Sequence, residues 1–370
     1  MEKILKSLIL NHPDASIGYD TFIDYALYHE NWGYYQKEGI KVGKEGDFYT
    51  SSMIHSIFAE MFADYFLKAS QSLNIPLQIC EIGGGNGTFA HQVIARLKSH
   101  QADYVYHLIE KSPFHRETLK LDDSADAFFL YESIEEFTRE NSFFEGLVFS
   151  NEWLDAQPVK VVEKYEGEIV EIQISLDEKD HYKEVVRPLD RELSLFINNY
   201  NFHFEEGQRI EVPLFMLQAV WGVDALLDRG LIVTVDYGYE RQDWNHPARR
   251  EGSLRGYKQH QLVKNVLQDP GEMDITHHVQ WDIWKALGED RGWKNIYLKN
   301  QKEFLLQSGI LQELIAHNNT DPFSEESKKN RAISSLVAGN GYSEAFDICI
   351  QAKNMTRESL TRHKKDLLSD

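Results

Sequence analysis

The sequence predicts an α/β fold built on a doubly wound sheet, with an N-terminal helical extension and inserted β-hairpin and helical elements. Three observations support this prediction. Short apolar runs alternate with helical patterns, which is typical of a parallel sheet covered by helices on both faces. A glycine-rich turn follows the first of these runs, where a strand would end and a helix begin. One later segment has an apolar residue at every second position, which marks the inserted hairpin.

Helical patterns come first along the chain. Residues 1–75 are expected to be helical, apart from one loop rich in glycine and aromatic residues at 31–50. The apolar runs that follow have the length of buried strands and are separated by helical patterns or loops. They are expected as strands at 77–82, 105–110, 127–131 and 146–150.

The pattern changes in the second half of the chain. Between 159 and 186, apolar residues alternate with polar ones around a Glu-Gly turn, which predicts an antiparallel hairpin. A helix is expected from about Pro213, since proline suits a first helical turn, and we expect it to end at Gly230. The later apolar segments are a strand at 231–235 and candidates for the sheet edge at 296–298 and 346–350.

These elements divide the chain into four predicted parts. They are an N-terminal helical region with its aromatic loop (1–75), the first part of the α/β core (76–158), a hairpin and helical insertion (159–229), and the remainder of the core with C-terminal helices (230–370). The charged tail at 356–370 is expected to be a solvated helix end.

Composition limits the classes of function. The 370 residues include 42% apolar residues, enough for a real core, and carry a net charge of −20, which disfavours a nucleic-acid partner. Such a charge attracts a basic peptide or protein segment instead. Cys80 and Cys349 are too few for a disulfide framework, and both are expected to be buried. With no predicted signal peptide or membrane span, we expect a cytoplasmic protein.

The glycine-rich turn is the strongest local signal of function. Glu81 ends an apolar run, and Gly83, Gly85 and Gly87 then follow in a G-x-G-x-G spacing. Glycines permit a tight turn and let the backbone approach a ligand closely. The dinucleotide fingerprint has a different spacing, G-x-G-x-x-G. With Glu81 just before the turn, the pattern resembles that of proteins that bind S-adenosylmethionine (SAM). A tight turn packed against a helix would also need glycines, so the motif taken alone leaves that alternative open.

A second acidic residue strengthens the case for a cofactor. Glu110 ends the next apolar run, 27 residues after Gly83. In nucleotide-binding βαβ units, an acidic residue at this point accepts hydrogen bonds from the ribose hydroxyls. The alternative is that Glu110 caps a helix that begins near Ser112 and Pro113. Both signals in register favour a cofactor site.

Polar residues also follow the fourth predicted strand. Asn151, Glu152 and Asp155 lie where the reacting group of an acceptor would be held. Two carboxylates suit a guanidinium, because they bind its planar fork through charge-assisted hydrogen bonds and draw positive charge away from the attacking nitrogen. The alternative is a helix N-terminus rich in capping residues.

Two further groups of residues have weaker signals. The segments 31–35 and 46–50 combine aromatic and glycine residues, which suits either a lid over a cationic cofactor or an ordinary packed loop. Asp274, His277 and His278 suggest a metal site, but adjacent histidines on a helix point about 100° apart, and no further ligand has a recognisable spacing. We therefore expect no metal. A serine hydrolase is disfavoured too, because the chain has no G-x-S-x-G motif.

Taken together, these blocks resemble the MidA-like methyltransferases, the family that includes the mitochondrial arginine methyltransferase of respiratory complex I assembly. The order of the blocks is as informative as any one of them. The matching blocks are Gly33–Tyr35, Gly46–Phe48, Glu81–Gly87, Asn151–Pro158, Asp236–Gly238, Gly252–Tyr257 and Pro270–His278. The resemblance implies a class I SAM-dependent methyltransferase fold, which is a Rossmann-like doubly wound sheet with additional helical and hairpin elements.

The resemblance also implies roles for individual residues. Residues expected to bind SAM are Glu81, Gly83, Gly85, Gly87, Glu110, Asp47 and Thr50. Asn151, Glu152 and Asp155 would face the methyl group. Residues expected on the acceptor side are Tyr35, Asp236, Tyr237, Arg255 and His278. The chain departs from its relatives at Gly84, Asn86 and Gln157, which leaves the identity of the acceptor open.

The sequence thus predicts methyl transfer from SAM to an arginine guanidinium on a protein, with S-adenosylhomocysteine (SAH) as the other product. Two alternatives stay open: a SAM-binding assembly factor with little turnover, and a methyltransferase that acts on a small molecule. A nicotinamide-dependent oxidoreductase would also bind its cofactor in a βαβ unit, but the G-x-G-x-G spacing of the glycines disfavours that class of enzyme. The expected partner is a protein with an exposed arginine segment, and a homodimer is left open.

Overall fold

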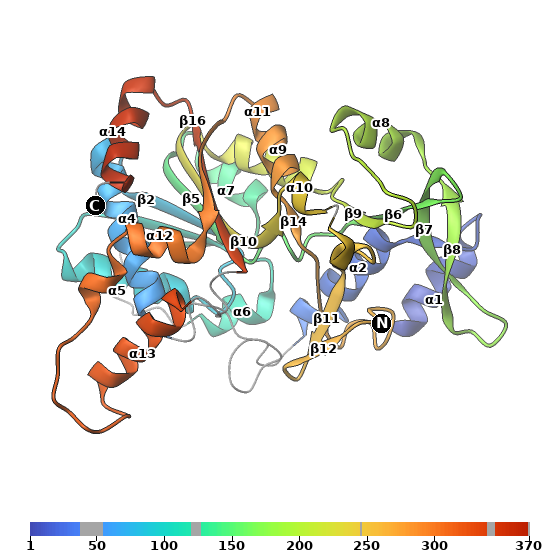
Figure 1. The fold of residues 1–370 in the computed structure, drawn as a ribbon, viewed down its shortest axis with the longest axis horizontal. Helices are drawn as coiled ribbons and strands as arrows, with labels where there is room; N and C mark the ends of the chain where they lie inside the picture. The colour runs from blue at the N-terminus through green and yellow to red at the C-terminus, as the bar shows by residue number, and fades with distance from the viewer. Residues whose placement is uncertain (38–54, 120–126, 245, 339–344, 369–370) are drawn as a thin grey trace. The chain divides into compact units, whose positions relative to one another are not determined.

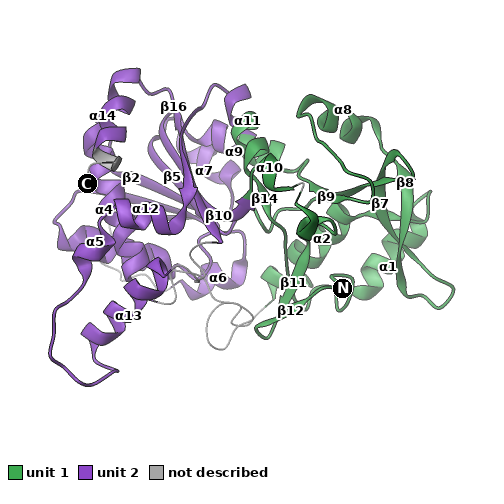
Figure 2. Ribbon diagram, viewed as in Figure 1, with its two compact units in different colours: residues 1–48, 154–220, 239–287 green, residues 49–153, 221–238, 288–370 purple. Residues whose placement is uncertain are grey.

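The computed structural model describes residues 1–37, 55–119, 127–244, 246–338 and 345–368. The chain divides into two compact units, each made of segments distant in sequence (Figure 2). Unit 1 comprises residues 1–48, 154–220 and 239–287, and unit 2 comprises residues 49–153, 221–238 and 288–370.

Unit 2 is built on a mixed sheet whose strands follow the order β15-β16-β10-β5-β2-β3-β4. Figure 1 labels four of them, β16, β10, β5 and β2. The run from β10 to β4 is parallel, whereas β16 is antiparallel to both β10 and β15. Every predicted strand of the core is confirmed, including both edge candidates. The bounds agree to within two residues, except that the strands expected at 231–235 and 346–350 extend further, to Tyr239 and Lys353. The strands are β2 (Gln78–Ile82), β3 (Val105–Ile109), β4 (Phe128–Tyr131), β5 (Glu145–Asn151), β10 (Arg229–Tyr239), β15 (Lys294–Asn300) and β16 (Phe346–Lys353).

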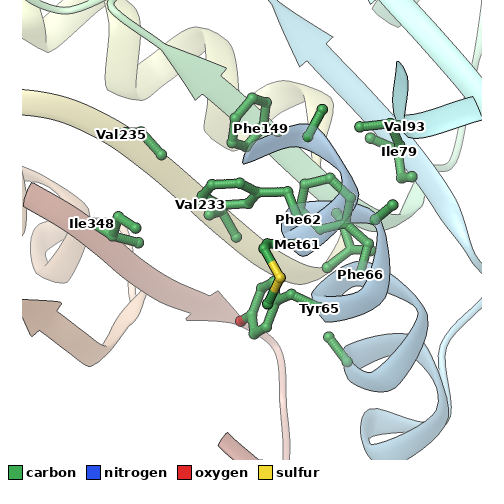
Figure 3. Close-up of a cluster of buried hydrophobic side chains, with 14 of the residues drawn as sticks. Met61, Phe62, Tyr65, Phe66, Ile79, Val93, Phe149, Val233, Val235 and Ile348 are labelled. Carbon is green, nitrogen blue, oxygen red and sulfur yellow. The ribbon is translucent and has the colours of Figure 1, made fainter. Parts of the chain in front are cut away.

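Helices pack onto this sheet through a large aromatic core. The rings of Phe62 of α4 and Phe149 of β5 belong to this core (Figure 3), and their centroids lie 5.1 Å apart. Phe149 also stacks on Phe89 of α5, with ring centroids 4.5 Å apart. Such aromatic pairs add to the free energy gained by burial. The helices of unit 2 are α4 (Ile57–Leu73), α5 (Thr88–Ser99), α6 (Pro113–Thr118), α7 (Ile134–Glu140), α12 (Gln301–Gln307), η3 (Ile310–Glu313), α13 (Glu325–Val337) and α14 (Arg357–Leu368).

Unit 1 contains the predicted antiparallel hairpin. It is formed by β6 (Lys160–Tyr165) and β7 (Glu168–Leu176), and it belongs to a sheet of order β1-β7-β6-β9 in which β8 also pairs with β7. The remaining strands are β1 (Ile17–Gly18), β8 (Tyr182–Pro188), β9 (Arg209–Val212), β11 (Arg255–Lys258), β12 (Gln261–Val263), β13 (Asp274–Thr276) and β14 (Val279–Gln280). The helices are α1 (Glu2–Asn11), α2 (Tyr19–Tyr28), η1 (Tyr34–Gln36), α8 (Arg191–Asn199), α10 (Arg241–Trp244) and η2 (Pro247–Arg249), while α9 (Met216–Leu226) and α11 (Trp281–Asp290) contain residues of both units.

Two expectations for the second half of the chain were wrong. The helix after Pro213 ends at Leu226, and Gly230 lies inside β10, where a Cβ would come within 1.8 Å of the carbonyl oxygen of Gly146 on β5. Close contact of two backbones requires glycine there. The tail is helical as expected but is not fully solvated, because His363 of α14 is buried and hydrogen-bonded to Tyr65 and Ser72 of α4.

Cys80 and Cys349 are buried, as predicted, in β2 and β16. Within the ranges that the structure describes, no helix is long and apolar enough to cross a membrane. In the same ranges, no group of three or more His, Cys, Asp or Glu side chains is arranged to hold a metal ion.

Candidate functional site

The glycine turn connects β2 to α5 through backbone conformations that L side chains rarely adopt. Gly83, Gly85 and Gly87 have φ values of 74°, 54° and 73°, and Gly87 is the N-cap of α5. The turn folds back on β3, because the backbone N–H of Gly83 donates to the carbonyl of Ile109 at 2.9 Å. A Cβ added to Gly85 would meet nothing within 4 Å. The space over Gly85 therefore fits a ligand that approaches the backbone.

Glu110 lies beside this turn, just beyond the carboxyl end of β3. Its Oε2 accepts a hydrogen bond from the backbone N–H of Gly85 and its Oε1 one from that of Ser112, both at 2.7 Å. Ser112 itself is the N-cap of α6, where its hydroxyl accepts from the N–H of His115. Glu110 is thus placed next to the glycine turn and also helps to satisfy the backbone at the start of α6.

Glu81 is a buried carboxyl group just before the turn. The hydroxyl of Tyr106 donates to its Oε2 at 2.7 Å, and no Lys or Arg in the described part of the chain forms an ion pair with it. Burial raises the pKa of Glu81 to about 7, and the charge of Glu110 adds to this effect while the Tyr106 hydrogen bond opposes it. A cationic ligand beside Glu81 would therefore be stabilised.

The end of β5 brings Asn151 and Glu152 to the same region of unit 2. Asn151 Nδ2 donates to Glu152 Oε1 at 3.0 Å, and Glu152 has a φ of 52° while its N–H donates to Val235 of β10. A left-handed backbone at a non-glycine residue costs about 1–3 kcal/mol and is concentrated at functional sites. Trp153 follows, and a Cβ on Gly83 would lie 3.4 Å from its Cδ1. The segment that carries Glu152 therefore packs against the glycine turn.

Two predicted acceptor-side residues lie on β10, next to β5. Asp236 is fully buried, and its Oδ1 accepts from the N–H of Tyr237 at 2.9 Å. The ring of Tyr237 meets Phe346 of β16 edge-on, with centroids 5.2 Å apart. Unit 2 thus brings together all the described residues that were predicted to bind SAM, with Asn151 and Glu152 beside the glycine turn.

Asp155 belongs to unit 1, because the boundary between the units falls between Trp153 and Leu154. It is buried, its Oδ2 accepts from the hydroxyl of Thr276 at 2.9 Å, and its carbonyl accepts from the N–H of His277. The prediction that Asp155 acts with Asn151 and Glu152 at the methyl group stays a prediction.

Tyr35 joins the same polar cluster of unit 1. Its hydroxyl donates to Asp274 Oδ1 at 2.6 Å, two positions along β13 from Thr276, and burial raises its pKa well above the ordinary value. Asp274 therefore has a neutral hydroxyl donor as a partner. The two other members of the predicted SAM site, Asp47 and Thr50, lie outside the described residues.

Glu211 of β9 was missed by the sequence analysis. Its buried carboxylate accepts from the N–H and the hydroxyl of Ser253, at 3.0 and 2.8 Å, and from the N–H of Leu254. Ser253 Oγ in turn accepts from the N–H of His278 at 2.9 Å. Glu211 therefore connects the two blocks that contain Arg255 and His278. The only local signal was a single carboxylate between two apolar strand residues.

His278 is kept neutral by its surroundings. Its pKa is lowered to about 2, chiefly by burial and further by the charge of Arg255. The imidazole meets the ring of Tyr239 edge-on at 4.7 Å. His278 is therefore suited to packing or to accepting a hydrogen bond, and not to carrying charge.

Comparison with known proteins agrees with this geometry. The sequence model of a family described as putative S-adenosyl-L-methionine-dependent methyltransferases matches residues 61–298, which include the glycine turn, Glu110 and Glu152. The chain belongs to this family. It is a SAM-dependent methyltransferase, and SAM is its methyl donor.

Among proteins with assigned names, this methyltransferase is similar to two relatives that are named as mitochondrial arginine methyltransferases. The NDUFAF7 homolog of Drosophila melanogaster is 26% identical over 320 residues, which cover 77% of this chain and 70% of the relative. NDUFAF7 of Xenopus tropicalis is 25% identical over 312 residues, which cover 75% and 68%.

The fold of the methyltransferase is shared with a solved structure from Burkholderia thailandensis. That protein is described as a COG1565 superfamily member and likely methyl transferase, and its structure contains SAH. The TM-score is 0.86 at 24% identity, with 98% of this chain and 94% of the other covered. This likeness confirms the predicted class I methyltransferase fold.

Proposed function

We propose that this methyltransferase transfers the methyl group of SAM to the guanidinium of an arginine on a protein. The observation that carries the proposal is the position of Glu152, whose segment packs against the glycine turn and whose carboxylate is held by Asn151. The names of the relatives, which are arginine methyltransferases, support the same acceptor.

The residues around the glycine turn fit SAM. The space over Gly85 admits a ligand close to the backbone, and Glu81 is a buried carboxyl group without an ion-pair partner among the described residues, which suits a cationic ligand. Glu110 would hold the ribose hydroxyls, and it would exchange its bond to Gly85 for them. When bound, SAM supplies a methyl group already activated by its sulfonium.

The protein would contribute alignment and charge complementarity. Glu152 would bind the guanidinium and hold one nitrogen in line with the methyl group, with Asp155 assisting. Asn151 holds Glu152 Oε1 through its amide nitrogen, so the carboxylate is already oriented. The proton released by the acceptor nitrogen would leave through a carboxylate or water.

The test is incubation of the protein and isotope-labelled SAM with lysate from cells that lack the protein. The expected result is a labelled protein band whose hydrolysate contains methylarginine. Label on lysine, or only on small molecules, would contradict the arginine acceptor. SAM binding without transfer to any acceptor would instead support a SAM-dependent assembly factor.

We also propose an acceptor protein with an exposed arginine segment as the partner, because the net charge of −20 attracts basic segments. A cytoplasmic location stays a proposal as well, although the relatives described above carry the word mitochondrial in their names.

A further inference from the structure

The strand at one edge of the unit 2 sheet contains no charged residue. This strand is β4, which reads Phe-Phe-Leu-Tyr, and none of the described strands pairs with its outer side. Edge strands of natural proteins usually carry charged residues or proline, because their outer backbone groups can otherwise pair with another chain. The opposite edge of the same sheet follows this rule, since β15 carries Lys294 and Lys299. The β4 edge therefore lacks the usual protection.

The backbone groups on the outer side of β4 belong to Phe128 and Leu130. The carbonyls of Ala127 and Tyr131 accept hydrogen bonds from β3 and the residue after it, at 2.8 and 2.9 Å. Alternate residues of a strand direct their N–H and C=O groups to opposite neighbours, so those of Phe128 and Leu130 are directed away from β3. The outer side of β4 thus presents both donors and acceptors to an added strand.

Apolar side chains beside this edge are partly exposed. Phe129 is 44% exposed, Leu130 is 36% exposed, and Phe143, two residues before β5, is 65% exposed. Consecutive residues of a strand point to opposite faces of the sheet, so Phe129 and Leu130 leave apolar surface on both faces. A strand that is apolar on both of its faces would cover these two side chains.

Acidic residues flank β4 in the sequence. Residues 122–136 include six Asp or Glu and no Lys, Arg or His. Glu132 and Glu135 are exposed, and Glu135 forms no ion pair with any residue in the described part of the chain. A second copy of this protein would bring the same negative charge to the edge, which disfavours the pairing of two β4 strands. A segment with basic residues at its ends is favoured instead.

We propose that the outer edge of β4 binds an extended segment of another protein, which adds a strand to the sheet and has an apolar centre flanked by Lys or Arg. Backbone hydrogen bonds to Phe128 and Leu130 supply affinity in this mode of binding, as in other cases of strand addition. The acidic residues select basic segments over acidic ones. This docking surface goes beyond methyl transfer and does not depend on which group accepts the methyl.

The experiment measures the binding of fluorescent peptides to the full chain by fluorescence anisotropy. The basic peptide KRTVIVTRK should bind saturably, while the acidic peptide EDTVIVTDE and the proline peptide KRTVPVTRK should bind far more weakly. Hydrogen exchange followed by mass spectrometry should show slower exchange of the β4 amides when the basic peptide is bound, because an added strand protects the outer N–H groups.

Leu130→Pro removes an outer N–H but no hydrogen bond to β3, and proline is tolerated at such positions of edge strands. It should weaken binding of the basic peptide about ten-fold, the effect of one lost hydrogen bond and a blocked edge. Glu135→Lys should weaken the same binding about three-fold, as expected for an exposed charge pair. Glu178→Lys, the same change at an exposed residue of unit 1, is the matched control and should bind as wild type does. Circular dichroism melting establishes that each variant is folded.

Equal binding of the basic and acidic peptides, or unchanged binding of the basic peptide to both folded Leu130→Pro and folded Glu135→Lys, would overturn the inference. Sedimentation experiments that show a wild-type dimer, dissociated by Leu130→Pro, would also overturn it, because the edge would then bind a second copy of this chain.

Discussion

The glycine turn of unit 2 and the polar cluster of unit 1 are assembled over very different distances along the chain. In unit 2, the glycines lie within five residues, and Glu110 bonds to Gly85 from 25 positions away. In unit 1, Tyr35 bonds to Asp274 across 239 positions, and Asp155 to Thr276 across 121. The turn is therefore recognisable from spacing alone, whereas the cluster exists only once the fold has brought its members together.

The comparison between the glycine turn and the polar cluster also predicts separate roles for the two units. If unit 2 holds SAM and the cluster of unit 1 serves the acceptor, changes at the glycine turn should alter SAM affinity. Changes in the cluster should alter the use of the acceptor and leave SAM affinity intact. The predictions below test this division.

The largest expected effect is at Glu81. Its pKa of about 7 lies above the value of 4.5 for an exposed Glu, so the folded state binds the proton more tightly than the unfolded state does. This contribution to stability is complete below pH 4.5 and is lost as the pH rises through 7, a loss of about 3 kcal/mol. In Glu81→Gln this loss of stability with rising pH should be absent. The free energy of unfolding in urea, measured at pH 5 and at pH 8, tests this.

The same variant should bind SAM about ten-fold more weakly, because a charge-assisted contact to the cation is removed. Glu140→Gln, an exposed change on α7, serves as the control for both measurements. A Glu81→Gln protein that is no more stable than wild type at pH 8 would contradict this, because it would show that burying the charged Glu81 carboxylate does not destabilise the folded state.

The second prediction concerns Gly85. In Gly85→Ala the new methyl enters the open space over the turn, so SAM affinity should fall by about 2 kcal/mol, the usual cost of overpacking. Gly167→Ala in the hairpin turn is a matched control, since Gly167 also has a positive φ and open space around its Cβ position. Both variants should lose about 1–2 kcal/mol of stability from backbone strain. If calorimetry gives the same SAM affinity for Gly85→Ala as for wild type, the ligand does not lie over Gly85.

The smallest of these effects is expected at Glu211, which belongs to unit 1. Glu211→Gln weakens the charge-assisted bonds to Ser253 and Leu254, which should cost about 1–2 kcal/mol in urea unfolding. The acceptor KM should rise while SAM affinity changes by less than about two-fold. Glu168→Gln, an exposed change on β7, is the control. If Glu211→Gln lost as much SAM affinity as Gly85→Ala does, the predicted separation of SAM binding in unit 2 from acceptor use in unit 1 would be contradicted.

Much of the fold was predictable because its signals are local. Apolar runs and turn residues located every core strand, although β10 and β16 extend further than expected, and the two-residue alternation identified the β6–β7 hairpin. The role of Gly230 was not predictable, because it depends on Gly146, a residue of a neighbouring strand. A glycine after an apolar helix has the same local pattern whether it ends the helix or allows two strands to approach.

The candidate site was predictable to a similar extent. Glu81 lies in the last part of β2, the glycines, Glu110 and Glu152 follow strand ends, and the structure brings them together in unit 2. Glu211 was missed because its partner Ser253 lies 42 positions away and nothing in its own neighbourhood indicates a contact. The left-handed backbone of Glu152 was also not predictable, since the hydrogen bond that accompanies it reaches Val235 on β10.

The most direct test of the central claim is a comparison of SAM binding and methyl transfer in Glu152→Gln. This change keeps the size of the side chain and removes the charge that would bind the guanidinium. The account predicts a loss of transfer of about 100-fold or more, with SAM affinity unchanged and Glu140→Gln active as wild type. Transfer by Glu152→Gln within about three-fold of wild type would contradict it, because a group that acts on the reacting atoms should matter far more than that.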